Sequence, residues 1–321
     1  MAMDKTAKQP RVKRRGLNHT QEQILLLVSE LRFLTRKAIW RLLFSLGSYT
    51  HAGETLHTLV ANGYLLRVSL TRARGNGEFI YTLGRIGALT LRELGVEETV
   101  WWARPYELSQ ASFSLLTHNS AIGLFHIALR LFVREHDGYE IIESRTCYQM
   151  ERRPPRLPTI REGRQAPSAV IPDSWVHVKL PDGRRFALWI EIDQGTESKT
   201  KYLTLLRERL SLIWSGQYEQ YFGTPSVQMC YLTIGTSEYR EARTKTLCQW
   251  TEELLANLRL TAWKDVFLFA GMGQDIEEAQ ALFLDRLWQR PYTRQAVSLF
   301  TPLQQQEESH GVQNLYPDYE G

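Results

Sequence analysis

The turn LPDGR at residues 180–184 constrains the fold more than any other feature of the sequence, because it fixes how two strands pair. Pro, Asp and Gly in this order are typical of a type I turn closed by a left-handed glycine, which makes a three-residue hairpin loop. The flanking strands then form an antiparallel hairpin in which Leu180 pairs with Arg184. A two-residue loop would shift the register by one residue and exchange the faces of one strand.

The three-residue loop divides the hairpin into an apolar face and a polar face. The apolar face carries Val176, Val178, Leu180, Phe186, Leu188, Ile190 and Ile192. The polar face carries Asp173, Trp175, His177, Lys179, Arg185, Trp189, Glu191 and Asp193. The two tryptophans of this face fall opposite each other, where they would either stack on exposed bases or pack against an adjoining helix.

Three carboxylates on one face of a hairpin need a physical reason, because strands disfavour Asp and directly opposed like charges destabilise a sheet. The register places Asp173 opposite Glu191, and Asp193 two residues further along the same face. A hard divalent cation with oxygen ligands, Mg²⁺ or Mn²⁺, would neutralise such a cluster. The alternative is a solvated face whose acids pair with Lys and Arg.

Length and composition indicate an intracellular protein with two domains. The chain has 321 residues, of which 43% are hydrophobic, enough for two ordinary cores. No apolar run is long enough to cross a bilayer, and the basic N-terminus lacks the apolar core of a signal peptide. The three cysteines are scattered, without metal or redox spacing. We therefore expect a cytoplasmic location and no membrane partner.

The charge is divided unequally along the chain. Residues 1–111 hold 16 Lys and Arg against 9 Asp and Glu, a net charge of +7. The remainder holds 23 against 26, a net charge of −3. A basic N-terminal domain favours a polyanionic partner, with double-stranded DNA the first candidate. The alternative is that the basic arm, residues 1–16, supplies most of this charge.

Residues 17–100 carry the pattern of three helices followed by a β-hairpin. Thr20 and Thr35 are predicted to cap the first two helices, and the third is expected over residues 50–62, ending at Asn62-Gly63. Strands over 64–70 and 79–83 flank the tip GNG, and a helix is expected over 84–94. This order resembles a winged helix-turn-helix, in which the third helix enters the major groove and the hairpin contacts the backbone.

The DNA-contacting candidates follow from this resemblance. On the third helix the predicted exposed residues are Tyr49, Thr50, His51, Glu54, Thr55 and Thr58. Glu54 would face phosphates poorly, which removes it from the contact set. Arg67, Arg72 and Arg74 lie in or beside the hairpin and would contact phosphates. The alternative is a winged helix used for protein docking or dimerisation.

A second domain is expected over residues 112–300, after a connector at 101–111 and before a disordered tail at 301–321. A helix over 112–135 is followed by a strand near 139–144 and an irregular loop over 151–168. After the hairpin come a helix over 200–214, a strand over 226–235 and a helix over 238–258. A strand over 265–270 and a helix near 275–290 complete the pattern. The whole chain is thus an α+β or α/β protein.

The order helix, three strands, helix, strand is similar to the core of the PD-(D/E)xK nuclease superfamily. Pro172-Asp173 matches its PD, and Glu191-Ile192-Asp193 stands where (D/E)xK belongs. With the N-terminal winged helix, a helical His118 and the run E-x-D-x-G-T-E at residues 191–197, the chain resembles the replication-relaxation family of bacterial plasmids and mobile elements. By its pattern alone, His118 would be a buried histidine of an apolar helix, whereas the resemblance implies that it lies near the acid cluster.

The resemblance implies a DNA-associated protein of replication or relaxation, with Mg²⁺-dependent phosphodiester hydrolysis as the chemistry of the superfamily. Asp173, Glu191 and Asp193 would hold the metal. The sequence departs from the pattern because Asp193 stands at the superfamily's catalytic Lys. Lys199 or Lys201 would reach back into the site, or both are solvated residues at a helix start.

Three functions stay open at the level of sequence. The first is a metal-dependent endonuclease or nicking protein, and the second is a DNA-binding adaptor whose nuclease fold has lost its chemistry. The third is a winged-helix interaction module. Beside DNA, the expected partners are other replication, conjugation or transposition proteins and a second copy of the chain.

Overall fold

The computed structural model describes residues 16–70, 78–96, 100–156, 169–293 and 296–300. The chain divides into two compact units, residues 1–116 and residues 117–321, each containing helices and one sheet. The mixed α+β class expected from the sequence is confirmed. The basic arm up to residue 15, the hairpin tip with Arg72 and Arg74, and the predicted tail lie outside the described residues.

Unit 1 combines helices with a three-stranded antiparallel sheet in the order β1-β3-β2. Its elements are α1 (His19–Leu31), β1 (Leu34–Thr35), α2 (Arg36–Leu43), α3 (Tyr49–Ala61), β2 (Leu65–Ser69), β3 (Phe79–Leu83), α4 (Arg85–Glu93) and α5 (Pro105–Gln110). Helix α5 lies in the predicted connector. Helix α6 (Phe113–Glu135) begins at the end of this unit and runs into the next.

Side-chain caps determine where the first two helices begin. The first helix begins earlier than Thr20 predicts, because Asn18 and Gln21 form a reciprocal capping box. Asn18 Oδ1 accepts from the Gln21 amide at 2.9 Å, and Gln21 Oε1 accepts from the Asn18 amide at 3.1 Å. The predicted cap of α2 is confirmed, since Thr35 Oγ1 accepts from the Ala38 amide at 3.2 Å.

Unit 2 is built on a five-stranded sheet in the order β4-β5-β6-β7-β8. The pairs β4–β5 and β5–β6 are antiparallel, and the pairs β6–β7 and β7–β8 are parallel. The strands are β4 (Glu140–Thr146), β5 (Ser174–Lys179), β6 (Arg185–Asp193), β7 (Gln228–Ile234) and β8 (Phe267–Met272). The helices after α6 are α7 (Cys147–Met150), α8 (Lys199–Trp214), α9 (Gln217–Phe222), α10 (Ser237–Asn257), the 3₁₀ helix η1 (Thr261–Val266) and α11 (Ile276–Leu284).

The predicted hairpin register is confirmed. The Leu180 amide donates to the Arg184 carbonyl at 2.8 Å, and the Gly183 amide donates to the Leu180 carbonyl at 2.9 Å. Gly183 has a φ of 85°, the left-handed conformation that glycine adopts without strain. The strands then pair Trp175 with Trp189, as the three-residue loop requires. The faces of β5 and β6 therefore carry the residues that the sequence assigns to them.

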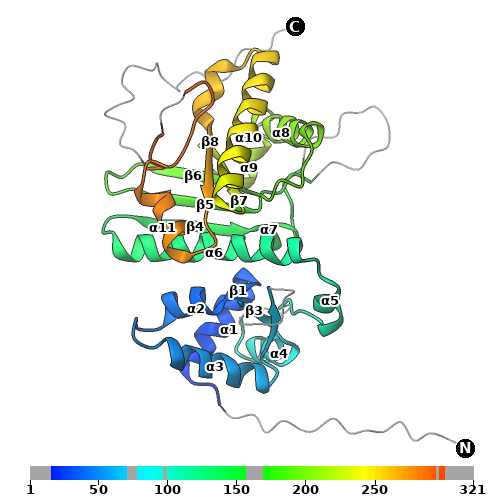
Figure 1. Cartoon of the computed structure of the whole chain (residues 1–321), viewed down its shortest axis with the longest axis vertical. Coiled ribbons are helices and arrows are strands. Elements are labelled where there is room, and N and C mark those ends of the chain that lie inside the picture. Colours follow the sequence, from blue (N-terminus) through cyan, green and yellow to red (C-terminus); the bar gives the residue numbers. More distant parts are fainter. Residues whose placement is uncertain (1–15, 71–77, 97–99, 157–168, 294–295, 301–321) are drawn as a thin grey trace, which may run out of the picture. The chain divides into compact units, whose positions relative to one another are not determined.

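Helices cover both faces of this sheet (Figure 1), so the face that carries the polar residues is largely buried. Helices α8, α9 and α10 pack over the face of Trp175 and Trp189, both of which are fully buried. Trp175 Nε1 donates to the Tyr218 hydroxyl of α9 at 3.0 Å. Of the two predicted roles for the tryptophan pair, packing against a helix is therefore the one that the structure has, and stacking on exposed bases is excluded by burial. Helix α9 itself was not predicted.

Helices α6 and α11 cover the opposite, apolar face (Figure 1). The Phe125 and Phe283 rings, from α6 and α11, lie 5.6 Å apart, and His126 Nε2 lies 2.7 Å from the Ser174 hydroxyl of β5. Helix α11 ends at Leu284 and not near residue 290, because Asp285 is extended. None of the described helices is both long and apolar enough to cross a bilayer.

Candidate functional site

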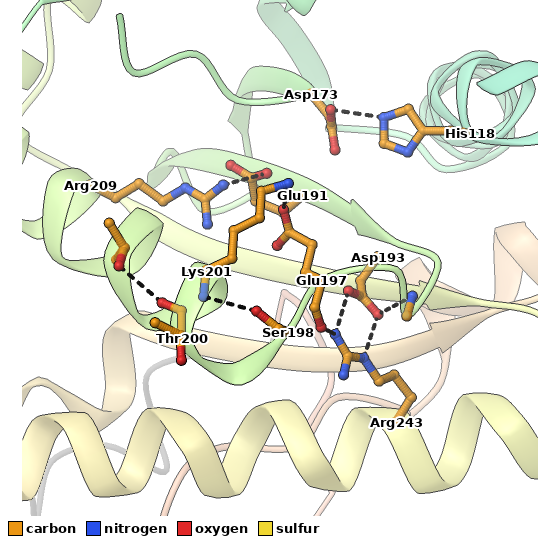
Figure 2. A network of polar contacts seen from close by, with 12 residues as sticks. His118, Asp173, Glu191, Asp193, Glu197, Ser198, Thr200, Lys201, Arg209 and Arg243 are labelled. Atoms are coloured by element: carbon orange, nitrogen blue, oxygen red, sulfur yellow. Dashed lines mark hydrogen bonds and ion pairs between the residues drawn. The ribbon is translucent and has the colours of Figure 1, made fainter. Parts of the chain in front are cut away.

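The acids singled out by the sequence meet beside the carboxyl end of the central strand β6 (Figure 2). Glu191 and Asp193 are among the last three residues of β6, and Asp173 directly precedes β5. They line a cavity of about 160 Å³. The other lining residues are His118, Ile192, Gln194, Thr196, Glu197, Tyr202, Arg209 and Tyr231. The predicted convergence of the three acids on one place is therefore present.

Asp173, directly before β5, contacts α6 and β6 through its two carboxylate oxygens. Oδ1 lies 3.0 Å from His118 Nε2 of α6. Oδ2 accepts a hydrogen bond from the Ile192 amide of β6 at 2.7 Å. The Asp173 side chain thus contacts both α6 and β6. His118 is therefore a direct partner of the acid cluster, as the family resemblance implied.

Glu191 is held by a buried arginine that the sequence analysis did not identify. Its Oε2 lies 2.8 Å from Arg209 Nη2 of α8, and its Oε1 accepts from Trp189 Nε1 at 2.6 Å. Arg209 Nη1 also donates to the Tyr231 hydroxyl at 3.1 Å. Burial raises the pKa of Glu191 to about 7, against the opposing effect of Arg209.

Asp193 is clamped by a second arginine. Arg243 of α10 donates from Nε to Oδ2 at 2.8 Å and from Nη2 to Oδ1 at 3.0 Å, the two-point geometry that favours Arg over Lys. The Gly195 amide donates to Oδ2 at 2.9 Å, and Arg243 Nη2 also donates to the Glu197 carbonyl at 3.1 Å. Asp193, which the sequence predicts to stand at the superfamily's Lys position, is therefore one half of a buried ion pair.

The two lysines at the start of α8 lie in different directions. Lys201 Nζ reaches Oε1 of Glu197, a residue that lines the cavity, at 2.9 Å (Figure 2). Lys199 Nζ instead pairs with Glu253 of α10. Of the two predicted candidates, Lys201 is thus the one that contacts a cavity residue.

A divalent cation does not fit the three acids as they are arranged. Mg²⁺ requires several oxygen ligands in near-octahedral order. Both oxygens of Asp193 accept hydrogen bonds from Arg243. The oxygens of Glu191 contact Arg209 and Trp189, and those of Asp173 contact His118 and the Ile192 amide. Across the part of the chain that is described, no group of three or more His, Cys, Asp and Glu could hold a metal. Metal-dependent hydrolysis stays a prediction.

The predicted DNA-contacting residues of unit 1 divide by exposure. Tyr49, Thr50, His51 and Thr58 are exposed on α3, and Arg67 is exposed on β2. Thr55 is only 8% exposed, so its prediction as an exposed contact is wrong. It lies one turn from Ala52 and Leu59, on the stripe that α3 buries.

Comparison with known proteins identifies the family. The replication-relaxation family model matches residues 25–226, more than half of the chain. The chain belongs to the replication-relaxation family. The match spans most of unit 1 and, in unit 2, the segment from α6 to α9 with the acid cluster. No curated protein and no solved structure matches the chain.

Arg243, the partner of Asp193, lies beyond the family match, whereas Arg209 lies within it. The sequence did hold one signal for Arg209. It lies three residues after Leu206 and seven after Tyr202, on the apolar stripe of the predicted helix, where a cation needs a buried partner. No comparable signal marks Arg243, because α10 has no clear apolar stripe in its sequence.

We expect His118 to titrate above its ordinary pKa of 6.5. Burial alone would lower the pKa, but the hydrogen bond and charge of Asp173, with the charges of Glu191 and Asp193, raise it overall. Between the ordinary and the raised value, the folded state holds a proton that the unfolded state has lost, so the unfolding free energy falls as pH rises. NMR titration of the ring should show a lower pKa in Asp173→Asn. An unchanged pKa would contradict the contact.

Proposed function

We propose that the protein binds double-stranded DNA in the replication of a plasmid or mobile element, and that its acid cluster serves structure and binding rather than hydrolysis. Unit 1 acts as a winged helix-turn-helix. The single observation that carries DNA binding is the placement of α3, with an exposed polar face, before the β2–β3 hairpin in the basic part of the chain. Family membership supports a role in replication or relaxation.

Unit 2 acts as a PD-(D/E)xK-like platform. The order α6, β4, β5, β6, α8, β7 supports this assignment, with α7 and α9 as short additions. The protein's own cations occupy the acids: Arg209 pairs with Glu191, and Arg243 pairs with Asp193. Such internal pairing stabilises carboxylates without a metal and fills the position of the catalytic Lys. A platform of this kind would position DNA or a partner protein.

The test combines binding and cleavage with the full chain. Purified protein is titrated into labelled duplex DNA at several salt concentrations, and supercoiled plasmid is incubated with Mg²⁺ or Mn²⁺ and resolved on a gel. Glu191→Gln, which keeps the side-chain shape, is compared with Glu253→Gln on the exposed part of α10. We expect salt-dependent binding by all three proteins and nicked product from none.

Two other outcomes would replace the proposal. Nicked or linear plasmid made by the wild type and by Glu253→Gln, but not by a folded Glu191→Gln, would establish the metal-dependent endonuclease. Its one structural support is that Asp173 and Glu191 line the same cavity. Weak, salt-independent DNA affinity would favour the interaction module, in which unit 1 docks a protein.

A further inference from the structure

Two arginines of unit 1 lie near Tyr81, the middle residue of β3. Arg67 of β2 pairs directly with Tyr81 of β3, so the two side chains share one face of the sheet. The Arg67 guanidinium lies over the neighbouring Phe79 ring, 4.8 Å from its centroid. Arg67 and Phe79 are exposed, whereas Tyr81 is 6% exposed. Arg67 thus stacks on the Phe79 ring and lies beside the buried Tyr81.

Arg36 reaches the same place from the first residue of α2. Its guanidinium lies over the Tyr49 ring, 4.1 Å from the centroid, and Tyr49 meets Trp40 edge-on at 5.1 Å. Gly53, one turn further along α3, keeps this space open, because a Cβ there would lie 3.2 Å from Arg36 Nη1. Arg36, at the start of α2, therefore stacks on Tyr49, at the start of α3.

Strand pairing places both arginines beside Tyr81, because Leu34 of β1 and Arg67 of β2 both pair with Tyr81, and Arg36 lies two residues after Leu34. Burial raises the pKa of Tyr81, the charges of Arg36 and Arg67 both oppose this, and Tyr49 adds to it. These electrostatic effects agree with the placement of both arginines beside Tyr81 by the strand pairing. We call Arg36, Tyr49, Arg67, Phe79 and Tyr81 the Tyr81 cluster.

Neither arginine of the Tyr81 cluster has a carboxylate within ion-pair distance among residues 16–70, 78–96 and the other described segments. The arginines of the acid cluster differ, since Arg209 and Arg243 are both paired. A guanidinium stacked on an aromatic face keeps its in-plane N–H donors free. Two such groups, preorganised and without an internal anion, match the oxygens of a phosphate.

We propose that Arg36 and Arg67 form a two-arginine clamp for a backbone phosphate of DNA, positioned by Tyr49 and Phe79. The inference rests on the proposed DNA binding and specifies its anchor. The clamp lies between the predicted recognition helix α3 and the hairpin, and it would set the register of α3 on the duplex. Phosphate contacts of this kind supply affinity and orientation, while base edges supply the choice of sequence.

The test measures the salt dependence of duplex binding by fluorescence anisotropy with full-length protein. Arg36→Gln and Arg67→Gln should each weaken binding about five-fold at 0.15 M salt and reduce the slope of log K against log salt by about 0.9, the value for one lost phosphate contact. The double variant should lose about twice that slope. Arg92→Gln, exposed on α4, removes the same charge away from the cluster and should change neither quantity by as much.

Conservative variants separate the clamp from a structural role. Arg36→Lys and Arg67→Lys keep the charge but lose the planar fork, so the salt slope should stay near the wild-type value while affinity falls. Thermal unfolding verifies that each variant is folded. Slopes of Arg36→Gln and Arg67→Gln equal to that of Arg92→Gln, with wild-type binding steep in salt, would overturn the clamp and leave the proposed function standing. A wild type that does not bind duplex DNA would overturn both.

Discussion

Replacing Arg209 with methionine is expected to lower the free energy of unfolding by about 3–5 kcal/mol near pH 8. The Arg209 side chain is 8% exposed and that of Glu191 is 13% exposed, and their closest atoms are 2.8 Å apart. Without Arg209, the charged Glu191 would stay buried with only the indole N–H of Trp189 as a partner. An uncompensated buried charge is among the largest penalties that one substitution can cause.

The same substitution should cost less near pH 5.5, because a proton can then neutralise Glu191. Burial already raises the pKa of Glu191 to about 7, and removing Arg209, which lowers it, raises it further. In the variant, the folded state thus binds a proton more tightly than the unfolded state, for which the ordinary pKa is 4.5. The unfolding free energy therefore falls as pH rises from the ordinary value to the raised one.

Urea denaturation in EDTA-containing buffer, followed by circular dichroism at both pH values, measures this difference. Arg207→Met, on the exposed side of the same helix, is the matched control and should change stability by no more than about 0.5 kcal/mol. Adding Glu191→Gln to Arg209→Met should recover much of the loss near pH 8. An equal loss at both pH values, or a loss no greater than that of the control, would show that the pair is not buried and coupled.

Local chemistry made the hairpin predictable from the sequence. The turn at residues 180–184 fixes the pairing through three adjacent residues, so Trp175 could be placed opposite Trp189 without any knowledge of the rest of the fold. The predicted bounds of α6, α8 and α10 likewise lie within one residue of those in the structure. The error at Thr55 was avoidable, since its spacing from Ala52 and Leu59 already placed it on the buried stripe.

Local sequence patterns do not reveal the helix partners of the acids, because these are long-range contacts, and only the family resemblance pointed to His118 as a neighbour of the acids. Arg243 lies 50 residues after Asp193, and His118 lies 55 residues before Asp173. A hairpin register says which strand residues share a face, but not which helix covers that face. The sequence therefore found where the acids converge and left open whether a metal or the protein's own cations neutralise them. The helices α8 and α10 supply two arginines there.

Replacing Arg243 with methionine is expected to lower the unfolding free energy by about 3–5 kcal/mol as well. The side chains of Arg243 and Asp193 are 10% and 7% exposed, and two hydrogen bonds join them. Arg243 also holds the Glu197 carbonyl, so the segment from Gln194 to Glu197 loses an anchor together with the ion pair.

A local readout separates this effect from global destabilisation. Native-state hydrogen exchange should show the Gly195 amide, which donates to Asp193 Oδ2, losing more protection in Arg243→Met than amides in the centre of β7. The control is Arg240→Met, one turn earlier on α10, which breaks a pair with Glu278, a residue that is 55% exposed. Such a surface pair contributes about 0–1 kcal/mol.

Combining Asp193→Asn with Arg243→Met removes the stranded charge and should restore part of the lost stability. Equal losses for Arg243→Met and Arg240→Met would mean that the Asp193 carboxylate is not neutralised by Arg243. Asp193 would then be available to a cation, and the metal site predicted from the sequence would gain support. A large loss in Arg243→Met that Asp193→Asn relieves would instead mean that Arg243 of α10, and not a metal, neutralises Asp193.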